Sequence, residues 1–142
     1  MYITKCLQIH ADNFQPSIED ILEAEALGVE PKVIPDENTV AMLSDNAVLA
    51  IGGNQGDRVW FLTSKYVPLF NLKERLEFRR LIIEYRNKML SQYESIWNFV
   101  WVGNKSHIRF LKTIGAVFHN EFIADGQFQL FTISRRQRER MY

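Results

Sequence analysis

Few side chains of this sequence have the type and spacing that catalysis requires. His107 lies three residues after Asn104, at the start of a predicted short helix, and an imidazole can act as a general acid or base near neutral pH. A lone histidine at a helix N-terminus more often serves capping or packing, so His107 is a weak catalytic candidate. Cys6 is the single cysteine and has no predicted histidine neighbour. We therefore expect a buried, unreactive thiol.

Metal and phosphate sites find little support in the spacing of residues. His10, His107 and His119 show no ligand spacing with Cys6 or with one another, so no metal site is predicted. The glycine-rich segment 52–56 has the composition of a phosphate-binding loop, but such a loop requires a helix directly after it. A strand is predicted there instead, which favours a simple turn.

The composition predicts one domain without a strong electrostatic field. The chain has 142 residues, of which 46% are hydrophobic, and its formal net charge is zero. Arginines gather in residues 134–142, but Glu139 interrupts them, and a short terminal run of charge is usually a solvated chain end. We therefore expect a domain over residues 1–133, a charged and mobile tail over 134–142, and no nucleic-acid partner.

The sequence lacks the signals of membrane insertion and export. No segment approaches 18 consecutive apolar residues, and residues 1–10 alternate in polarity where a signal peptide has a basic region before an apolar run. No membrane span is expected, and a single cysteine fits a reducing cytosol.

The stretch from residue 95 to 118 carries the clearest structural pattern. Residues 96–102 are too apolar on both faces for a surface strand, which predicts a central strand covered on both sides. Asn104 can cap a helix over residues 105–114, Gly115 can end that helix, and a partly exposed strand follows at 116–122.

The remaining residues predict one more helix on each side of a series of hairpins. Strands are expected within 2–10 and at 39–43, 47–51, 59–63 and 127–133. A helix from Ser17 to Gly28 should lie on the sheet through Ile18, Ile21, Leu22 and Leu27, with Glu19, Glu23 and Glu25 in solvent. A long helix from Asn71, with Glu74 as capping-box partner, to about Tyr93 should bury Phe78, Leu81 and Met89 and keep its arginines, including Arg86, mostly off that face. Strands before and after the long helix should be parallel neighbours. The fold class is therefore α/β in the broad sense (α+β), with a mixed, mainly antiparallel sheet of about seven strands and three helices.

Aromatic side chains are frequent along the predicted central strands. Trp60, Trp97, Phe99, Trp101 and Phe110 should form one cluster. Core packing is the favoured interpretation, and a partner-binding surface is the alternative if some of them face outward.

The order of these elements and the spacing of two residues resemble a known fold. Asn104, which opens a short helix after a central strand, and Gly115, which closes it, resemble the C-terminal half of the GNAT acyltransferase fold. His107, Leu111 and Ala116 stand where that motif usually has a small residue, Tyr and Phe. The segments DILEAEALGVEP, LAIGGNQGD, WNFVWVGNKSHIRFLKTIGAVF and DGQFQLFTI are similar to the small internal virion proteins of T-seven-like short-tailed phages, a resemblance that spans residues 20 to about 133.

The GNAT resemblance implies where acyl-coenzyme A would bind. In that family two splayed strands receive the pantetheine arm, and a glycine-rich loop at the start of the long helix holds the pyrophosphate. The corresponding positions here are Leu62 and Thr63 on the first strand, Arg75 at the helix start, and Asn104 after the second strand.

Two departures from the family pattern argue against that activity. Leu76 and Phe78 occupy the glycine positions of the pyrophosphate loop, and Leu111 replaces the tyrosine that commonly protonates the leaving thiolate. We therefore expect no cofactor and favour a domain without enzymatic activity.

The phage resemblance implies a role in virion morphogenesis. On this interpretation, a degenerate acyltransferase scaffold helps to assemble or deliver internal virion proteins, and its partners are viral core or portal-associated proteins. It would work in the cytoplasm of the infected bacterial host, and in the virion if it is packaged. The alternative is an active GNAT-type acyl-CoA N-acyltransferase that binds acetyl-CoA or another acyl-CoA at an atypical pyrophosphate site, with Lys73, Arg75 or Arg79 replacing backbone contacts.

Overall fold

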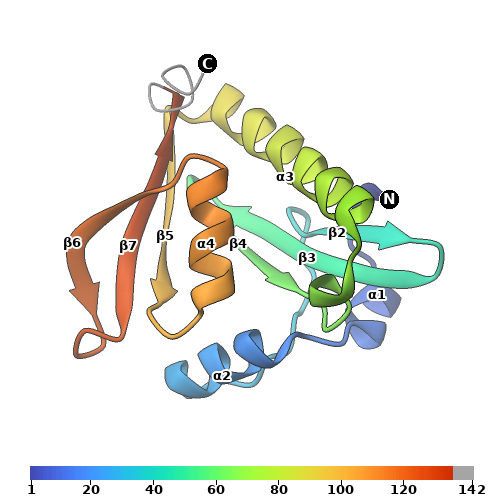
Figure 1. Ribbon diagram of the computed structural model, residues 1–142, viewed down its shortest axis with the longest axis horizontal. Helices are drawn as coiled ribbons and strands as arrows, with labels where there is room; N and C mark the ends of the chain where they lie inside the picture. Colours follow the sequence, from blue (N-terminus) through green and yellow to red (C-terminus); the bar gives the residue numbers. More distant parts are fainter. Residues whose placement is uncertain (136–142) are drawn as a thin grey trace.

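A computed structural model describes residues 1–135 as seven strands, four α-helices and one short 3₁₀ helix (Figure 1). In chain order these are β1 (Tyr2–Lys5), α1 (Gln8–Asn13), α2 (Ile18–Leu27), β2 (Val40–Ser44), β3 (Ala47–Gln55), β4 (Arg58–Thr63), η1 (Val67–Leu69), α3 (Leu72–Gln92), β5 (Ser95–Trp101), α4 (Lys105–Thr113), β6 (Val117–Ile123) and β7 (Phe128–Ser134). The predicted fold class is confirmed. Of the predicted tail, Ser134 ends β7 and Arg135 is described, whereas the arginines from residue 136 onward lie outside the described residues.

All seven strands form one sheet in the order β1-β2-β3-β4-β5-β7-β6. Every neighbouring pair is antiparallel except β4 and β5, which are parallel, as the crossover through α3 requires. These two strands pair at one position only, Arg58 with Trp97. Beyond that position they run apart, and Figure 1 shows the space between them widening toward α2. We call this space the β4–β5 wedge.

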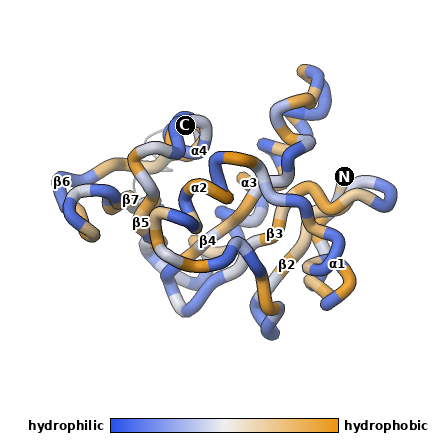
Figure 2. Tube along the Cα trace, turned by 90° about the horizontal axis from the view of Figure 1, so that it is seen from below, coloured by the Kyte–Doolittle hydropathy of each residue, from blue (hydrophilic) through white to orange (hydrophobic). Residues whose placement is uncertain are grey.

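Alternate residues of β2 and β3 pack on opposite faces of the sheet. Met42 and Leu49 join Phe78 of α3 in one cluster, whereas Ala41 and Val48 join another cluster on the α1 side. Both faces of this half of the sheet are therefore covered, and Figure 2 shows hydrophobic residues concentrated along β2 and β3. A third cluster forms between β5, β7, α3 and α4, with Leu90, Val100 and Leu111 at its centre.

The predicted first strand is too long. β1 ends at Lys5, and α1 begins at Gln8, because the His10 Nδ1 accepts a hydrogen bond from the Leu7 backbone N–H at 3.0 Å. A ring that satisfies a free N–H at the start of a helix stabilises that start. Cys6 lies between the two elements and is buried, as expected.

The glycine-rich segment lies mostly within β3. A Cβ at Gly52 would lie 2.9 Å from the Trp60 carbonyl oxygen, and one at Gly53 would lie 3.1 Å from the Trp60 ring. These glycines therefore allow β3 and β4 to approach closely, and the chain reverses after them at Gly56, which has a φ of 58°.

Helix α3 follows the prediction at its ends but not along its whole length. Asn71 and Glu74 form the predicted capping box, and Phe78, Leu81 and Met89 are buried. Arg86 was expected off the buried face, yet it is 3% exposed and its Nη1 donates to the Ile114 carbonyl oxygen at 2.8 Å. A buried guanidinium persists because carbonyl oxygens replace its lost water.

The five aromatic residues expected to form one cluster are divided: Trp60 packs on the α1 side of the sheet, whereas Phe110 contacts Phe78 of α3 with ring centroids 5.7 Å apart. Trp60, Trp97, Phe99, Trp101 and Phe110 all retain some exposure. Trp97 contacts Phe99 edge to face with ring centroids 6.1 Å apart, and its indole N–H donates to Asp57 Oδ1 at 3.0 Å. These rings pack at the rim of the core.

No helix among residues 1–135 combines the length and hydropathy needed to cross a bilayer.

Candidate functional site

The β4–β5 wedge is where the fold leaves backbone groups of two strands without strand partners, and α2 lies across it. Asp20 Oδ2 accepts hydrogen bonds from the Thr63 backbone N–H at 2.8 Å and from the Thr63 hydroxyl at 3.2 Å. Glu23 Oε1 accepts from the Trp101 backbone N–H at 2.9 Å. Two carboxylates from one helix therefore bind main-chain donors of both separated strands.

This contact reverses the predicted orientation of α2. Ser17 caps the helix as expected, since its hydroxyl accepts from the Asp20 N–H, but Asp20 is buried and Glu23 is half-buried. Ile18 and Leu22, expected to pack on the sheet, are 67% and 41% exposed. The helix turns its acidic side inward because free N–H groups of the strands await an acceptor there.

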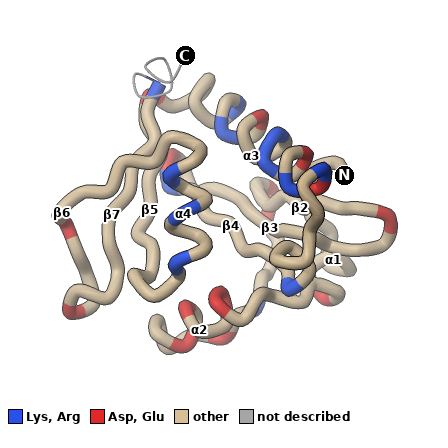
Figure 3. The backbone as a smooth tube through the Cα atoms, viewed as in Figure 1, with Lys and Arg blue, Asp and Glu red and all other residues tan. Residues whose placement is uncertain are grey.

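Helix α4 closes the other side of the wedge mouth. Asn104 is 1% exposed, and its side chain accepts from the His107 backbone N–H and donates to Asp20 Oδ1 at 3.1 Å. Ser106 donates through its hydroxyl to Glu19 Oε2 at 2.7 Å. Figure 3 shows that the charged residues of α2 are acidic and those of α4 basic, so the two facing helices attract each other.

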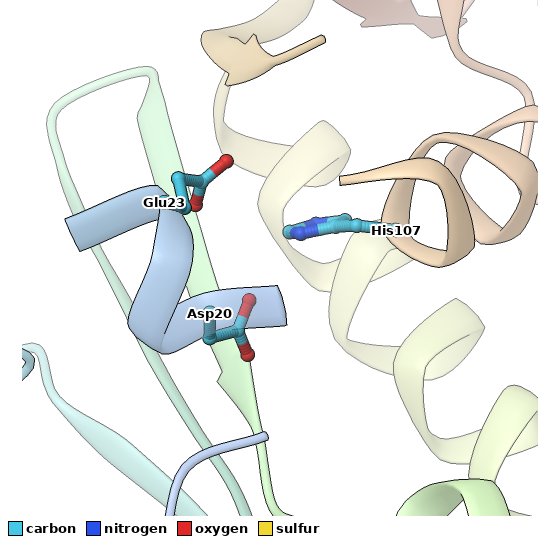
Figure 4. Close-up of side chains that lie close together, drawn as sticks. All are labelled: Asp20, Glu23 and His107. Carbon is cyan, nitrogen blue, oxygen red and sulfur yellow. The ribbon is translucent and has the colours of Figure 1, made fainter. Parts of the chain in front are cut away.

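His107 completes a cluster with Asp20 and Glu23. One ligand-type atom from each of these three residues lies within 4.8 Å of the other two. Figure 4 shows the imidazole of α4 pointing toward the two carboxylates of α2. The His107 residue as a whole is half-buried, and the centroids of its ring and the Phe61 ring are 4.3 Å apart. Its Nε2 is buried and has no hydrogen-bond partner within residues 1–135.

Burial shifts two pKa values in this cluster. It lowers the pKa of His107, against the opposing pull of the Asp20 and Glu19 charges. It raises the pKa of Glu23, and the hydrogen bond from the Trp101 N–H partly offsets that rise. The imidazole is therefore held toward its neutral form, in which one ring nitrogen has a free lone pair.

Side chains also occupy the narrow end of the wedge. The Phe99 N–H donates to the Asn98 side-chain oxygen at 2.7 Å, and the Asn98 amide donates to the Val59 carbonyl oxygen at 2.7 Å. The Trp97 N–H donates to the Asp57 carbonyl oxygen at 3.1 Å. The β5 donors at Trp97, Phe99 and Trp101 are thus all satisfied within the chain.

A cavity of about 260 Å³ lies behind these polar contacts. Its walls are mainly apolar and include Val59, Phe61, Ile82 and Met89, with His107 among the few polar groups.

The structure brings together three of the sequence-predicted site residues and leaves one apart. Thr63, Asn104 and His107 all surround Asp20, and Leu62 lines the cavity. Arg75 lies in the first turn of α3, where its Nε donates to the Phe70 carbonyl oxygen at 3.1 Å.

Sequence reasoning missed Asp20 and Glu23. Acidic residues in the first turns of a capped helix are common on solvated surfaces, so their type and position gave no sign of burial. Their role depends on N–H groups that lie 43 and 78 residues further along the chain.

The start of α3 does not fit an acyl-coenzyme A diphosphate. The Asn71 side chain accepts from the Glu74 N–H, and the Glu74 carboxylate accepts from the Asn71 N–H. A carboxylate already uses the helix dipole that a diphosphate would need, and like charges repel. Of the two residues at the glycine positions, Leu76 is 59% exposed, whereas Phe78 is 3% exposed and packs in the core, so Phe78 cannot turn aside without loss of packing.

Comparison with known proteins identifies relatives in sequence. Residues 38–123 match the family model described as "Bacteriophage T7, probable scaffold protein Gp13". A protein of Escherichia phage T7 named "Probable scaffold protein gp13" is 58% identical over 123 residues, which cover 86% of this chain and 88% of the relative.

Solved structures resemble the fold at low sequence identity. The GNAT domain of S. lividans PAT has a TM-score of 0.63 and 12% identity, over 93% of this chain and 89% of that one. An N-acetyltransferase from Staphylococcus aureus has a TM-score of 0.55 and 10% identity, over 94% and 96%. At this identity the likeness establishes a GNAT-like fold alone.

Proposed function

Because the chain belongs to the family of Bacteriophage T7 probable scaffold protein Gp13, we propose that it acts in virion morphogenesis, as a binding protein for other viral proteins. We further propose that it assists assembly or delivery of internal virion proteins, with core or portal-associated proteins as partners. Its place of action would be the cytoplasm of the infected bacterium and, if it is packaged, the virion.

One observation carries the proposal that this GNAT-like fold works without acyl-coenzyme A. Asp20 and Glu23 occupy the Thr63 and Trp101 N–H groups at the place where a pantetheine arm would need them. Displacing the two carboxylates would leave buried or half-buried charge without its donors, at a cost of several kcal/mol. We therefore expect no acyl-CoA cofactor.

Exposed apolar side chains in the N-terminal third of the chain support a binding role. Leu7, Ile9, Ile18, Leu22 and Ile34 are each at least 41% exposed. Apolar surface of this kind favours protein contacts when a partner covers it.

A phage complementation experiment tests the proposed role. A phage that lacks this gene is grown on cells that supply either the wild-type chain or the Ile18→Glu/Leu22→Glu variant, and viral proteins that co-purify are identified. We expect the variant to fold yet to lose viral partners and infectious yield. The matched control is Leu72→Glu/Leu76→Glu on α3, where the leucines are 73% and 59% exposed and so at least as exposed as Ile18 and Leu22. If both variants keep their viral partners and infectious yield, Ile18 and Leu22 have no binding role.

A thermal-shift titration tests the acyltransferase alternative. A ligand at one hundred times its dissociation constant stabilises a protein by about 2.7 kcal/mol, or several degrees in a domain of this size. We expect no shift with millimolar acetyl-CoA. A saturable rise in melting temperature would favour the acyltransferase alternative.

A further inference from the structure

Among the described residues 1–135, the buried Nε2 of His107 has no hydrogen-bond partner. A buried polar atom without a hydrogen bond costs about 1–3 kcal/mol, and native structures usually supply such an atom with a partner, an ordered water or an ion. The His107 imidazole points toward the two carboxylates of Asp20 and Glu23 (Figure 4), and one of its ring nitrogens lies within 4.8 Å of an oxygen of each.

We propose that Asp20, Glu23 and His107 bind one divalent transition-metal ion of the zinc class, which joins α2 to α4 across the wedge mouth. The donor set is one imidazole nitrogen and two carboxylates. Imidazole suits zinc and its neighbours in the transition series, whereas magnesium and calcium prefer sites built from oxygen alone.

The ligand atoms of the three residues need to move only slightly to bind one ion. Their ligand-type atoms already lie within 4.8 Å of one another, and two ligands at about 2 Å from a common tetrahedral ion lie about 3.3 Å apart. Rotations of the Glu23 and His107 side chains provide the remaining movement. Three protein ligands leave a fourth position for water, as zinc sites with three ligands commonly do.

The hydrogen bonds around the cluster resemble the outer shell of a metal site. Asp20 is held by Thr63 and Asn104, and Glu23 is held by the Trp101 N–H. Each of these donors uses one lone pair of a carboxylate oxygen, and other lone pairs remain for an ion. Outer contacts of this kind orient ligands and raise metal affinity.

Calorimetry on the untagged, EDTA-treated full chain tests the site, with ZnCl₂ as the probe. We expect one ion per chain and a melting temperature higher by several degrees at saturation. With CoCl₂ as a second probe, visible d–d bands should report a low-coordinate site. The absence of saturable zinc binding at millimolar concentration would overturn the proposal.

Single substitutions locate the ion. His107→Gln and Glu23→Gln should each weaken zinc binding at least tenfold, and Glu23→Gln keeps an oxygen to accept from the Trp101 N–H. His10→Gln and His119→Gln, at the two other histidines, should bind as the wild type does. Unchanged binding in His107→Gln, or lost binding in either control, would overturn the assignment.

A measurement in EDTA separates the metal from a simple hydrogen bond. If the His107 ring needs an ion, His107→Leu should be at least as stable as the wild type in EDTA and less stable in zinc. If His107 instead donates to a carboxylate, His107→Leu should be destabilised in EDTA, and the proposal fails. Should His107→Leu not fold, the same comparison with Glu23→Gln and the cobalt spectrum of the wild type decides the question.

Discussion

At the scale of single residues, Asn104 links the start of α4 to the Asp20 carboxylate of α2. It caps α4, hydrogen bonds Asp20 and is almost fully buried. Asn104→Ala would remove the cap and leave a carboxylate oxygen of Asp20 without its donor. We expect a loss of about 2–4 kcal/mol in the free energy of unfolding, measured by urea denaturation.

The control for that measurement is Ser106→Ala. Ser106 also links α4 to α2, but it is exposed, and its bond to Glu19 competes with water. Its loss should cost below about 1 kcal/mol. Equal losses in the free energy of unfolding would show that the buried contact of Asn104 stabilises the fold no more than the exposed contact of Ser106 does.

Cys6 provides a residue-scale prediction about pH. Burial raises the pKa of its thiol, so the folded chain keeps the proton to higher pH than the unfolded chain does. The resulting contribution to stability is complete below the unfolded pKa and is lost as the pH rises through the folded pKa. At pH 8, iodoacetamide should therefore modify the native protein far more slowly than the urea-unfolded protein. Equal rates would show that the thiol is accessible.

At the scale of elements, α2 shows why a helix can be predicted when its orientation cannot. Ser17 and Gly28 set its ends through contacts within a few residues, and both signals are visible in the sequence. The direction of its faces depends on Thr63 and Trp101, which no local pattern links to it. Apolar periodicity assigned Ile18 to the core. Ile18 is exposed instead, because the opposite side of α2 carries the carboxylates that accept from the Thr63 and Trp101 N–H groups.

The observed orientation of α2 predicts that polar substitutions at Ile18 and Leu22 hardly change stability. The double substitution Ile18→Gln/Leu22→Gln should change the free energy of unfolding by less than about 0.5 kcal/mol per site, because both side chains are exposed. If the helix packed as its periodicity suggests, each change would cost about 2 kcal/mol or more. Guanidinium unfolding distinguishes the two cases, with Leu111→Ala in the core of α4 as the destabilised reference.

The stretch from β5 to β6 was the most predictable part of the chain. Asn104 and Gly115 act on backbone groups next to them, and Gly115 has the φ of 98° that its position as a helix stop requires. The cluster of Asp20, Glu23 and His107 was the least predictable, since it joins residues more than 80 positions apart that carry no shared pattern.

At the scale of the whole molecule, the sheet consists of two halves, and their cores meet at Ile82 of α3 and Phe110 of α4, which pack against both. One half comprises β1 to β4 and the other β5 to β7, and α3 contributes to the packing of both. Asn98 links the halves, since its side chain contacts Val59 and Arg58 of β4. Asn98→Ala should therefore lower the free energy of unfolding by about 1–2 kcal/mol and speed hydrogen exchange at the boundary more than within β7. Uniform exchange across the sheet would contradict this division.

The single pairing of β4 with β5 also gives the molecule a mechanical seam. β5 and β7 pair at seven residue positions, and β3 and β4 at six, whereas β4 and β5 pair at one. A tensile load drawn through the chain should therefore separate the halves before either one unravels. The helix that spans the wedge would act as a latch, and its release would determine the force at which the fold first yields.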